Sequence, residues 1–521
     1  MNSVIAMRHR CRSNLSLPCH SRKNGNPVPT QFFLILYAQS LKALFRDHQA
    51  ERRVFYPRFI LLPFPRASCY LQIMRSNVLV YTISIITAMV IGWTLFNPDY
   101  GTMIQYILML LFYIIIAWFI LVAFVTDQKE RNFLISLFLL ALALRIVVSL
   151  LLHTIVPRGY FAPDETLYID SGKALADSWA ESTIYTYTGS KAPPQTIVSA
   201  ILFYMSGNKL YVALLFENFI GALTVLNIYF ITKRFFNRES ARYASVITAI
   251  FPSLVLWSSL LLKDPNTQFL ISFAVLLTLR LKERLRMSDL ILLIGSVILV
   301  GFFRSYLILI VSMAIGTSFI SFNKDTFIRN FFILIVFSMG FALFFSVYET
   351  KNIPKYETNK GNAFQSLQQI RSGFYQGGSK ILGNINVSTP INALKYFPLL
   401  IIVFYLAPFP WDITGSMLHN LATMESLLWY YLLYYAIKGI IRALKEGNYD
   451  VMPVLVMIGV LSVAYALAIS NIGAAYRFRA QVSVLLMVFS GYGLYLRKQE
   501  HLKKYALPVE PNISSSSPQS S

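Results

Sequence analysis

Charged residues are scarce in this sequence. Among 521 residues they account for 13%, which is about half the share found in soluble globular domains, so a soluble enzyme is disfavoured. Hydrophobic residues make up 56%, and the mean hydropathy of +0.55 is too high for a chain that is disordered throughout. Neither a glycine triplet nor a heptad pattern runs through the sequence, which excludes collagen and coiled coil. What remains is a membrane protein with several spans.

Cysteine is confined to the first 73 residues, at Cys11, Cys19 and Cys69. This segment has eleven lysines and arginines against two acids, but no span-length apolar run and no signal-peptide order. It resembles translated dispersed bacterial repeats. We therefore expect 1–73 to be either a mis-assigned start, with translation beginning at Met74, or a disordered basic cytoplasmic tail. The rest of the chain lacks cysteine, so its core is expected to hold no disulfide and no cysteine-ligated metal.

Long apolar runs fill 74–498. They predict an all-α transmembrane bundle of about twelve spans, with about one span of uncertainty either way. The stretch 397–409 is short and bracketed by prolines, so we interpret it as re-entrant or interfacial. The Pro/Ser-rich end, 499–521, is predicted to be a disordered cytoplasmic tail. The expected spans are 77–97, 103–125, 132–156, 209–232, 241–262, 265–281, 289–303, 305–322, 330–347, 421–441, 451–470 and 478–496.

The net charge of +22 comes largely from short basic clusters between these runs, as is typical of the cytoplasmic side of a membrane protein. Nucleic acid is therefore not an expected partner, whereas the lipid bilayer is. With residue 76 inside, the clusters follow one alternation, both termini are cytoplasmic, and the long loops 157–208 and 348–396 face outside. The basic clusters are Lys129/Arg131, Lys233/Arg234/Arg238/Arg242, Arg280/Lys282/Arg284/Arg286, Lys324/Arg329, Lys438/Arg442/Lys445 and Arg497/Lys498.

A second set of charges lies at the edges of the apolar runs, all on the expected outer side. Placing one charge at the centre of a bilayer costs about 2.5–3.5 kcal/mol, so each requires a reason. Because arginine and lysine hold phosphate well, their convergence predicts a site for an anionic substrate. These residues are Asp164, Glu165, Lys263, Asp264, Arg304, Arg477 and Arg479.

For Arg477 and Arg479, which run against the positive-inside trend, a functional role is favoured. The other positions also have a purely structural interpretation. Pro163 predicts a helix start, and acids in a first turn complement the helix dipole. Tyr168 and Trp179 recur on one face of that helix, which we expect to be amphipathic and to lie on the outer membrane surface. Lys263 and Asp264 can pair with each other in a turn, and Arg304 can snorkel from a turn between short spans. His153 and His419 lack partners at metal spacing, so packing is favoured over ligation and no metal site is predicted.

The stretch from about 160 to 310 resembles the glycosyltransferase-C superfamily, which uses polyprenyl-phosphate sugars. Protein O-mannosyltransferases and lipid A aminoarabinose transferases are among its members. The similar motifs, in order, are Pro163-Asp-Glu165 with Tyr168, Lys191-Ala-Pro-Pro194, Gly221-Ala-Leu-Thr-Val225 with Tyr229 and Lys233-Arg-Phe-Phe236, Phe251-Pro252, Lys263-Asp264, and near the end Tyr476-Arg-Phe-Arg479. Where the family has a histidine before Pro-Pro, this sequence has Ala192, and no Asp-x-Asp metal motif is evident.

The resemblance implies sugar transfer from a polyprenyl-phosphate donor to a glycolipid, glycan or protein acceptor, with inversion, on the periplasmic face of a bacterial inner membrane. Asp164, or less favourably Glu165, would be the catalytic base. The donor phosphate would be bound by Lys263, Arg304, Arg477 and Arg479, with Tyr168 and Asp264 in support. No cofactor is expected, and a divalent metal is left open.

Two other classes of protein remain open. An O-antigen or exopolysaccharide polymerase or ligase would also use outer arginines, but it does not need an acidic pair at the start of the first large loop. A transporter or flippase would need no catalytic acid, although such proteins usually show two related halves, and none is evident here.

Overall fold

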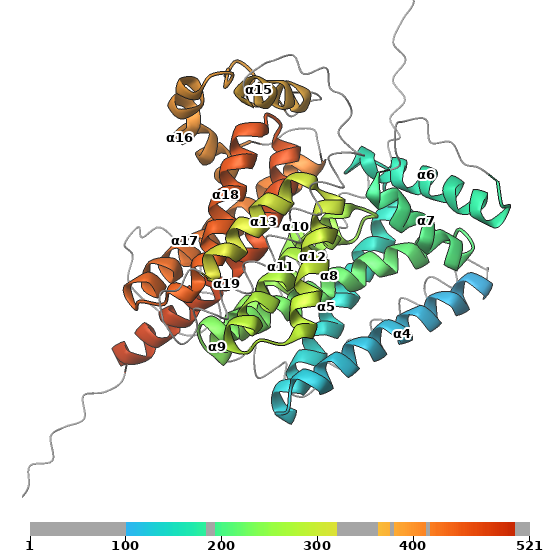
Figure 1. The fold of residues 1–521 in the computed structure, drawn as a ribbon, viewed down its shortest axis with the longest axis horizontal. Coiled ribbons are helices and arrows are strands. Elements are labelled where there is room, and N and C mark those ends of the chain that lie inside the picture. Colours follow the sequence, from blue (N-terminus) through green and yellow to red (C-terminus); the bar gives the residue numbers. More distant parts are fainter. Residues whose placement is uncertain (1–99, 184–192, 320–362, 376–379, 413–416, 506–521) are drawn as a thin grey trace, which may run out of the picture. The chain divides into compact units, whose positions relative to one another are not determined.

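The computed structural model describes residues 100–183, 193–319, 363–375, 380–412 and 417–505 (Figure 1). Within these residues the chain is helical, and the sole β contact is an isolated bridge between Lys380 and Asn471, so the all-α expectation is confirmed. The segment 1–73, the expected spans 77–97 and 330–347, and the last residues of the tail lie outside the described residues. The helices are α4 (Tyr100–Phe124), α5 (Gln128–Ile155), α6 (Pro163–Ala180), α7 (Pro194–Ser206), α8 (Leu210–Phe235), α9 (Arg238–Ile250), α10 (Pro252–Ser258), α11 (Lys263–Glu283), α12 (Met287–Phe303), α13 (Ser305–Ser318), α15 (Ala363–Phe374), α16 (Pro390–Leu406), α17 (Met417–Lys445), a 3₁₀ turn η1 (Tyr449–Val451), α18 (Met452–Ala468) and α19 (Ile472–Tyr505).

Five helices among the described residues are long and apolar enough to cross a membrane: α4, α5, α8, α18 with its 3₁₀ turn, and α19. The chain is therefore a multi-pass membrane protein, while the expected number of about twelve spans remains a prediction. The expected span 241–262 is broken into α9 and α10, which bend by 55° and give a sixth candidate. Pro252 explains the break, because it has no N–H to continue α9 and suits the first turn of α10.

The basic clusters within the described residues lie at one common end of the bundle, while Lys324/Arg329 falls outside those residues. Ion pairs join Arg234 at the end of α8 to Glu283 at the end of α11, and Lys282 of α11 to Asp450 before α18. A third pair joins Lys498 of α19 to the start of α9. The alternation expected from the sequence therefore corresponds to real neighbours, although the side of the membrane remains a prediction.

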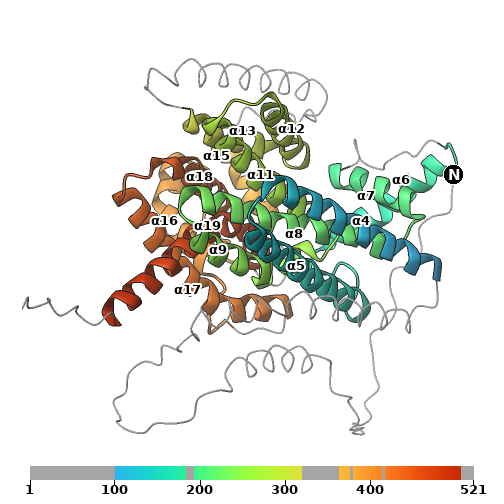
Figure 2. The same ribbon diagram turned by 90° about the horizontal axis from the view of Figure 1, so that it is seen from below.

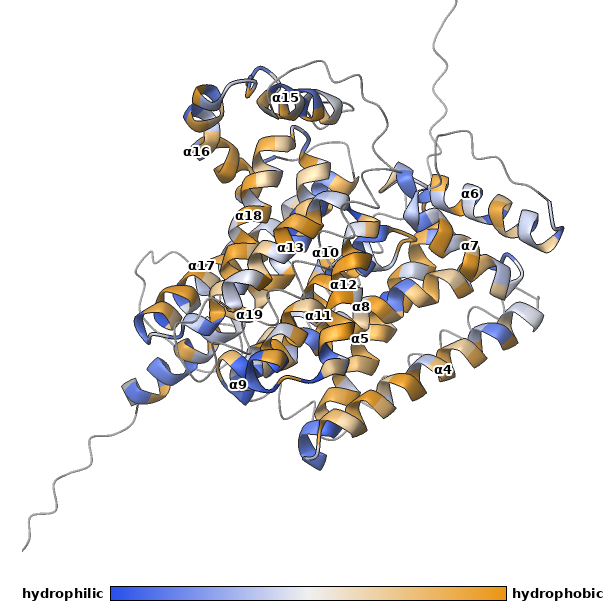
Figure 3. Ribbon diagram, in the orientation of Figure 1, coloured by the Kyte–Doolittle hydropathy of each residue, from blue (hydrophilic) through white to orange (hydrophobic). Residues whose placement is uncertain are grey.

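Helix α8 lies at the centre of the described bundle and α4 at its edge (Figures 1 and 2). Of the most apolar stretch of α8, 89% is buried within the protein, against 22% for α4. The colouring in Figure 3 agrees, since α4 is apolar along nearly its whole length. Because α4 exposes large apolar side chains such as Leu108 and Phe119, we assign that surface to lipid.

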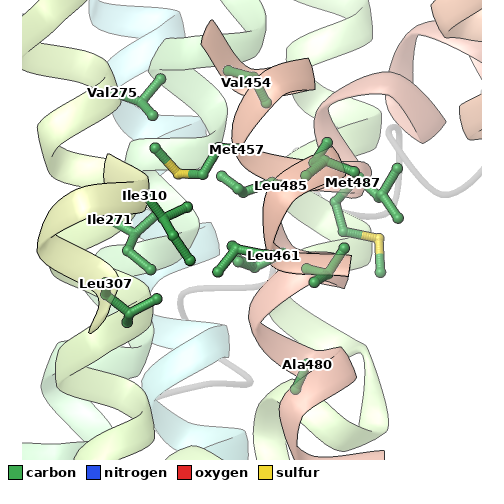
Figure 4. Packing of buried hydrophobic residues seen from close by; sticks show 14 of the residues in the cluster. Ile271, Val275, Leu307, Ile310, Val454, Met457, Leu461, Ala480, Leu485 and Met487 are labelled. Atoms are coloured by element: carbon green, nitrogen blue, oxygen red, sulfur yellow. The ribbon is translucent and has the colours of Figure 1, made fainter. Parts of the chain in front are cut away.

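Helices α17 and α19 pack so closely that glycine is required at their contact. A Cβ at Gly439 would lie 2.3 Å from the carbonyl oxygen of Phe489, and one at Gly493 would lie 2.0 Å from that of Tyr435. Close approach through small residues is typical of membrane helices. Helices α11, α13, α18 and α19 share a hydrophobic core, in which Ile271, Ile310 and Met457 pack together (Figure 4).

Helix α16 dips into the bundle, and the chain then turns back. Near its end, Trp429 Nε1 donates to the carbonyl of Tyr405 at 2.7 Å. The following residues then run back towards the start of α17, because Ser426 donates to the carbonyl of Pro408 and Thr423 to that of Asp412. This course supports the re-entrant interpretation of 397–409.

Two helices, α6 and α7, occupy the long loop 157–208. The helix predicted from Pro163 is present as α6, and Pro163 lies in its first turn. Tyr168 and Gly172 are buried on its inner face, and Trp179, in the last turn of the helix, is 40% exposed. Tyr168 and Trp179 are eleven positions apart, which at about 100° per residue leaves them only about 20° apart around the helix, and the Trp179 ring packs on Tyr204 of α7 at 6.2 Å between ring centres. Its place on the membrane surface remains a prediction.

Candidate functional site

Asp264 is the centre of a polar cluster near the starts of α11 and α19. Its carboxylate is fully buried and accepts a hydrogen bond from Arg304 Nη2 at 2.8 Å. Arg477 Nε donates to its other oxygen at 2.8 Å, and Gln481 Nε2 donates at 3.0 Å. One buried acid thus holds in fixed positions Arg477 of α19 and Arg304 of the link between α12 and α13.

Asp164 adjoins this centre from the first turn of α6. Arg477 Nη1 donates to Asp164 Oδ2 at 3.1 Å, so one guanidinium bridges the two aspartates. The Asp164 side chain is 44% exposed, whereas that of Asp264 is 0% exposed. Asp164 is therefore the acid of this pair that a substrate can reach.

Lys263 adds a third positive charge beside these groups. Its ammonium is near enough to interact electrostatically with Asp164, Asp264, Arg304 and Arg477. In the part of the chain that the structure describes, the ammonium has no hydrogen-bond or ion-pair partner. Asp164, Lys263, Asp264, Arg304 and Arg477 are called the outer cluster below, after their expected side. Three cations against two acids leave the cluster with one excess positive charge.

Aromatic side chains line the buried side of the outer cluster. Arg304 Nη1 donates to Tyr306 at 3.1 Å, and its guanidinium stacks 4.6 Å from the ring centre of Phe478. Tyr465 donates to Gln481 at 2.6 Å and thereby orients the amide that binds Asp264. The stacking and hydrogen bonds fix the arginine planes before any ligand arrives.

Tyr168 lies on the buried face of α6, one turn after Asp164. Burial, followed by the charge of Asp164, raises the pKa of Tyr168 to about 12. Its hydroxyl is therefore protonated at neutral pH and can act as a hydrogen-bond donor, not as a base. This is compatible with the supporting role expected from the sequence, which remains a prediction.

Glu165 is adjacent to Asp164 but belongs to a different set of contacts. Its side chain is 4% exposed and binds His153 Nε2 at 3.0 Å. The backbone N–H of Leu261 donates to the same carboxylate oxygen at 2.9 Å. Sequence analysis missed the role of His153, because its partner lies on another helix. Glu165 is thus tied into the protein, which weighs against its use as the base.

Arg479 is not brought to the outer cluster. Its Nη1 donates to the carbonyls of Tyr405 and Ala407 at 3.0 and 2.7 Å, which lie in the last turn of α16 and directly after it. The guanidinium also lies 5.6 Å from the ring centre of Trp429. This position gives Arg479 a role in fixing the end of α16 and leaves its expected role in phosphate binding as an untested prediction.

The start of α11 is held by a further buried acid that sequence analysis did not single out. Glu217 of α8 accepts hydrogen bonds from Gln195 at 2.8 Å and from Asn266 at 2.9 Å. Asn266 comes two residues after Asp264, and Gln195 follows the Pro-Pro element that opens α7. The amide contacts therefore fix α7, α8 and the first turn of α11 together. A charge inside the apolar run of α8 was the available signal.

No three His, Cys, Asp or Glu side chains gather in a metal-binding arrangement within the described residues.

Residues 190–348 match the family model described as Dolichyl-phosphate-mannose-protein mannosyltransferase. The resemblance to the glycosyltransferase-C superfamily is confirmed over this part of the chain. The matched range contains Lys263, Asp264 and Arg304, whereas Asp164 and Arg477 lie outside it. The chain is thus a multi-pass helical membrane protein, of which the segment 190–348 is similar to this glycosyltransferase family.

Solved structures with a similar arrangement include the apo oligosaccharyltransferase of Archaeoglobus fulgidus. It is 15% identical, with a TM-score of 0.39, and the alignment covers 70% of this chain and 51% of that one. The same organism's AglB, solved with an inhibitory peptide and a dolichol-phosphate, is 14% identical with a TM-score of 0.38, covering 72% and 52%. The chain therefore spans about half the length of these proteins. No curated protein matches it in sequence.

Proposed function

We propose that this protein transfers a sugar from a polyprenyl-phosphate donor to an acceptor hydroxyl on the outer face of a bacterial inner membrane. The observation that carries the proposal is the outer cluster, in which one reachable carboxylate lies beside three cations. A base and a phosphate-binding group are the two elements that such a transfer requires.

Lys263 and Arg477 are the groups best suited to bind the donor phosphate. The ammonium of Lys263 is without a partner in the described part of the chain, and the Arg477 side chain is 12% exposed. Arg304 is 5% exposed and bound to Asp264, so it contributes charge from behind. A phosphate that takes a hydrogen bond from Arg477 would compete with Asp164 for it and would release that carboxylate for catalysis.

The reaction is an in-line displacement at the anomeric carbon. Asp164 takes the proton of the acceptor hydroxyl, whose oxygen forms the new bond to the anomeric carbon as the bond to the phosphate oxygen breaks. The polyprenyl phosphate leaves with the bonding electron pair and gains negative charge. Lys263, Arg304 and Arg477 stabilise this charge more strongly in the transition state than in the ground state. Displacement in one step inverts the anomeric configuration.

The test is mass spectrometry of envelope glycolipids and glycoproteins from a deletion strain complemented with wild type or Asp164→Asn. We expect one defined sugar mass to vanish on deletion and to return with wild type alone. Asp170→Asn is the matched control, because Asp170 is an exposed acid on the same helix. Full rescue by Asp164→Asn would contradict the proposed base. Such rescue combined with loss of function in Arg477→Ala would favour a polymerase or ligase acting on lipid pyrophosphates.

A further inference from the structure

His153 and Glu165 form a buried pair directly behind the first turn of α6. Both side chains are 4% exposed. The pair brings together three segments, since His153 lies in the last turn of α5, Glu165 in the first turn of α6, and Leu261 in the link between α10 and α11. None of these contacts involves a group of the outer cluster.

Proton counting determines the state of this pair. His153 Nδ1 lies 2.8 Å from the carbonyl oxygen of Ser149, which can only accept, so Nδ1 carries a proton. Nε2 lies 3.0 Å from Glu165 Oε1, and that oxygen also accepts from the backbone of Leu261. A second proton must lie between Nε2 and Oε1, whichever atom holds it. The pair is then neutral as a whole, as a buried site requires.

The pair joins the two chain segments that carry the aspartates of the outer cluster. Asp164 immediately precedes Glu165. On the other segment, Lys263 follows Leu261 by two residues and is itself followed by Asp264. The first turn of α6 has no side-chain cap of its own, because Ala162 occupies the cap position. The start of α11, in contrast, is also held by Arg304, Gln481 and the amide contacts of Glu217.

We propose that His153 and Glu165 are positioning residues, which share one proton and fix the Asp164 carboxylate in reach of an acceptor bound next to the donor phosphate. The inference deepens the proposed function, and it assigns Glu165 a role other than that of a base. Losing the pair displaces Asp164 but leaves the phosphate-binding cations in place. Transfer should therefore fall while affinity for the lipid phosphate is retained.

The chemistry of the pair predicts which substitutions are tolerated. His153→Leu offers no donor to Glu165. Glu165→Gln leaves either the Leu261 N–H or a neutral imidazole unmatched. An amide oxygen in the place of Oε1 accepts from Leu261 but faces the Nε2 lone pair, and an amide nitrogen there donates to Nε2 but faces the Leu261 N–H. His153→Gln keeps one N–H donor, and the contacts of Glu217 with Gln195 and Asn266 show that amides can satisfy a buried glutamate in this protein. His153→Gln should therefore rescue part of what His153→Leu loses.

The experiment combines three measurements on the full chain. Transfer is measured from the sugar product of the complemented strain, and affinity is measured on the purified protein with undecaprenyl phosphate as the probe. Hydrogen exchange is followed by mass spectrometry in peptides covering 160–170 and 256–266. A misplacement of about 1 Å can cost about 100-fold in rate, so we expect a loss of about that size for His153→Leu and Glu165→Gln. The double variant should be no worse than either single one, and Asp170→Asn should behave as wild type.

Exchange in both peptides should be at least about tenfold faster in His153→Leu than in wild type, with His153→Gln between them, as expected when buried hydrogen bonds are lost. Wild-type transfer by His153→Leu, additive losses in the double variant, or unchanged exchange would overturn the inference. If wild type forms no sugar product, the proposed function fails, and the exchange series still decides whether the pair fixes the start of α6.

Discussion

The two ends of the bundle carry charge in different ways. At the inner end, Asp127 and Glu130 pair with Lys233 and Arg238, and the four charges cancel. We call these four residues the inner cluster. At the outer end the ion pairs also balance, but Lys263 stands beside them without a partner in the described residues.

The two clusters also differ in which of their charged groups is exposed to solvent. The cations of the inner cluster reach solvent, with side chains 43% and 36% exposed for Lys233 and Arg238. In the outer cluster Arg304 is 5% exposed, and the group that reaches solvent is the acid Asp164, at 44%. The balanced charges and exposed cations of the inner cluster fit a role in anchoring helix ends. Under the proposed function, the excess positive charge of the outer cluster binds an anion, and the exposed acid beside it takes a proton.

The largest expected effect is that of Asp164→Asn. An asparagine keeps the size of the side chain and its contact with Arg477 but cannot take a proton, so transfer should fall by about 1000-fold or more. Membrane insertion and thermal stability should stay close to wild type, because the side chain is partly exposed. The measurement is product formation by mass spectrometry beside the midpoint of thermal unfolding. If transfer falls only together with the unfolding midpoint, the loss reflects folding and the comparison fails.

Removing the central acid should destabilise the protein more in the outer cluster than in the inner cluster. Asp264→Ala leaves Arg304 and Arg477 buried without their counter-charge, which should cost about 3–5 kcal/mol. Glu130→Ala should cost less, about 1–3 kcal/mol, because Lys233 and Arg238 can turn to water. Thermal unfolding of both purified variants in the same detergent provides the measurement. Equal destabilisation would show that exposure of the cations does not distinguish the two ends.

Lys263→Met tests the excess charge of the outer cluster. Removing one of three cations around a leaving phosphate should lower transfer by about 10- to 100-fold, which corresponds to about 1.4–2.7 kcal/mol of transition-state stabilisation. The unfolding midpoint should be unchanged or slightly raised, because the variant no longer buries part of an unpaired ammonium. Affinity for undecaprenyl phosphate should also fall. Wild-type transfer in this variant would remove Lys263 from the site.

Much of the fold and part of the site followed from local features of the sequence. Apolar runs predicted most helices, because burial in lipid depends on the composition of each run alone. Charges at the edges of those runs identified four residues that the structure brings together from three helices and one link between helices. They are Asp164, Asp264, Arg304 and Arg477. Local hydropathy could not predict the break at Pro252 as a bend of 55°.

Partners distant in sequence were not predictable in this way. His153 seemed isolated because no local pattern indicates Glu165 on the next helix, and Glu217 lies 49 residues from Asn266. The different positions of the Arg477 and Arg479 side chains, however, could have been predicted from the sequence. Residues two positions apart on a helix point in directions about 160° apart, so one guanidinium facing the outer cluster places the other on the far side.

The smallest expected effect is that of Lys233→Met in the inner cluster. Lys233 donates to Glu130 at 2.6 Å, but Tyr229 and Arg238 also contact that carboxylate, and Lys233 is largely exposed. An exposed ion pair contributes less than about 1 kcal/mol, so the unfolding midpoint should fall only slightly and transfer should be that of wild type. The variant removes the same charge as Lys263→Met, at the other end of the bundle and from a balanced set. A comparable loss of transfer in both variants would mean that net charge, and not the outer cluster, controls the reaction.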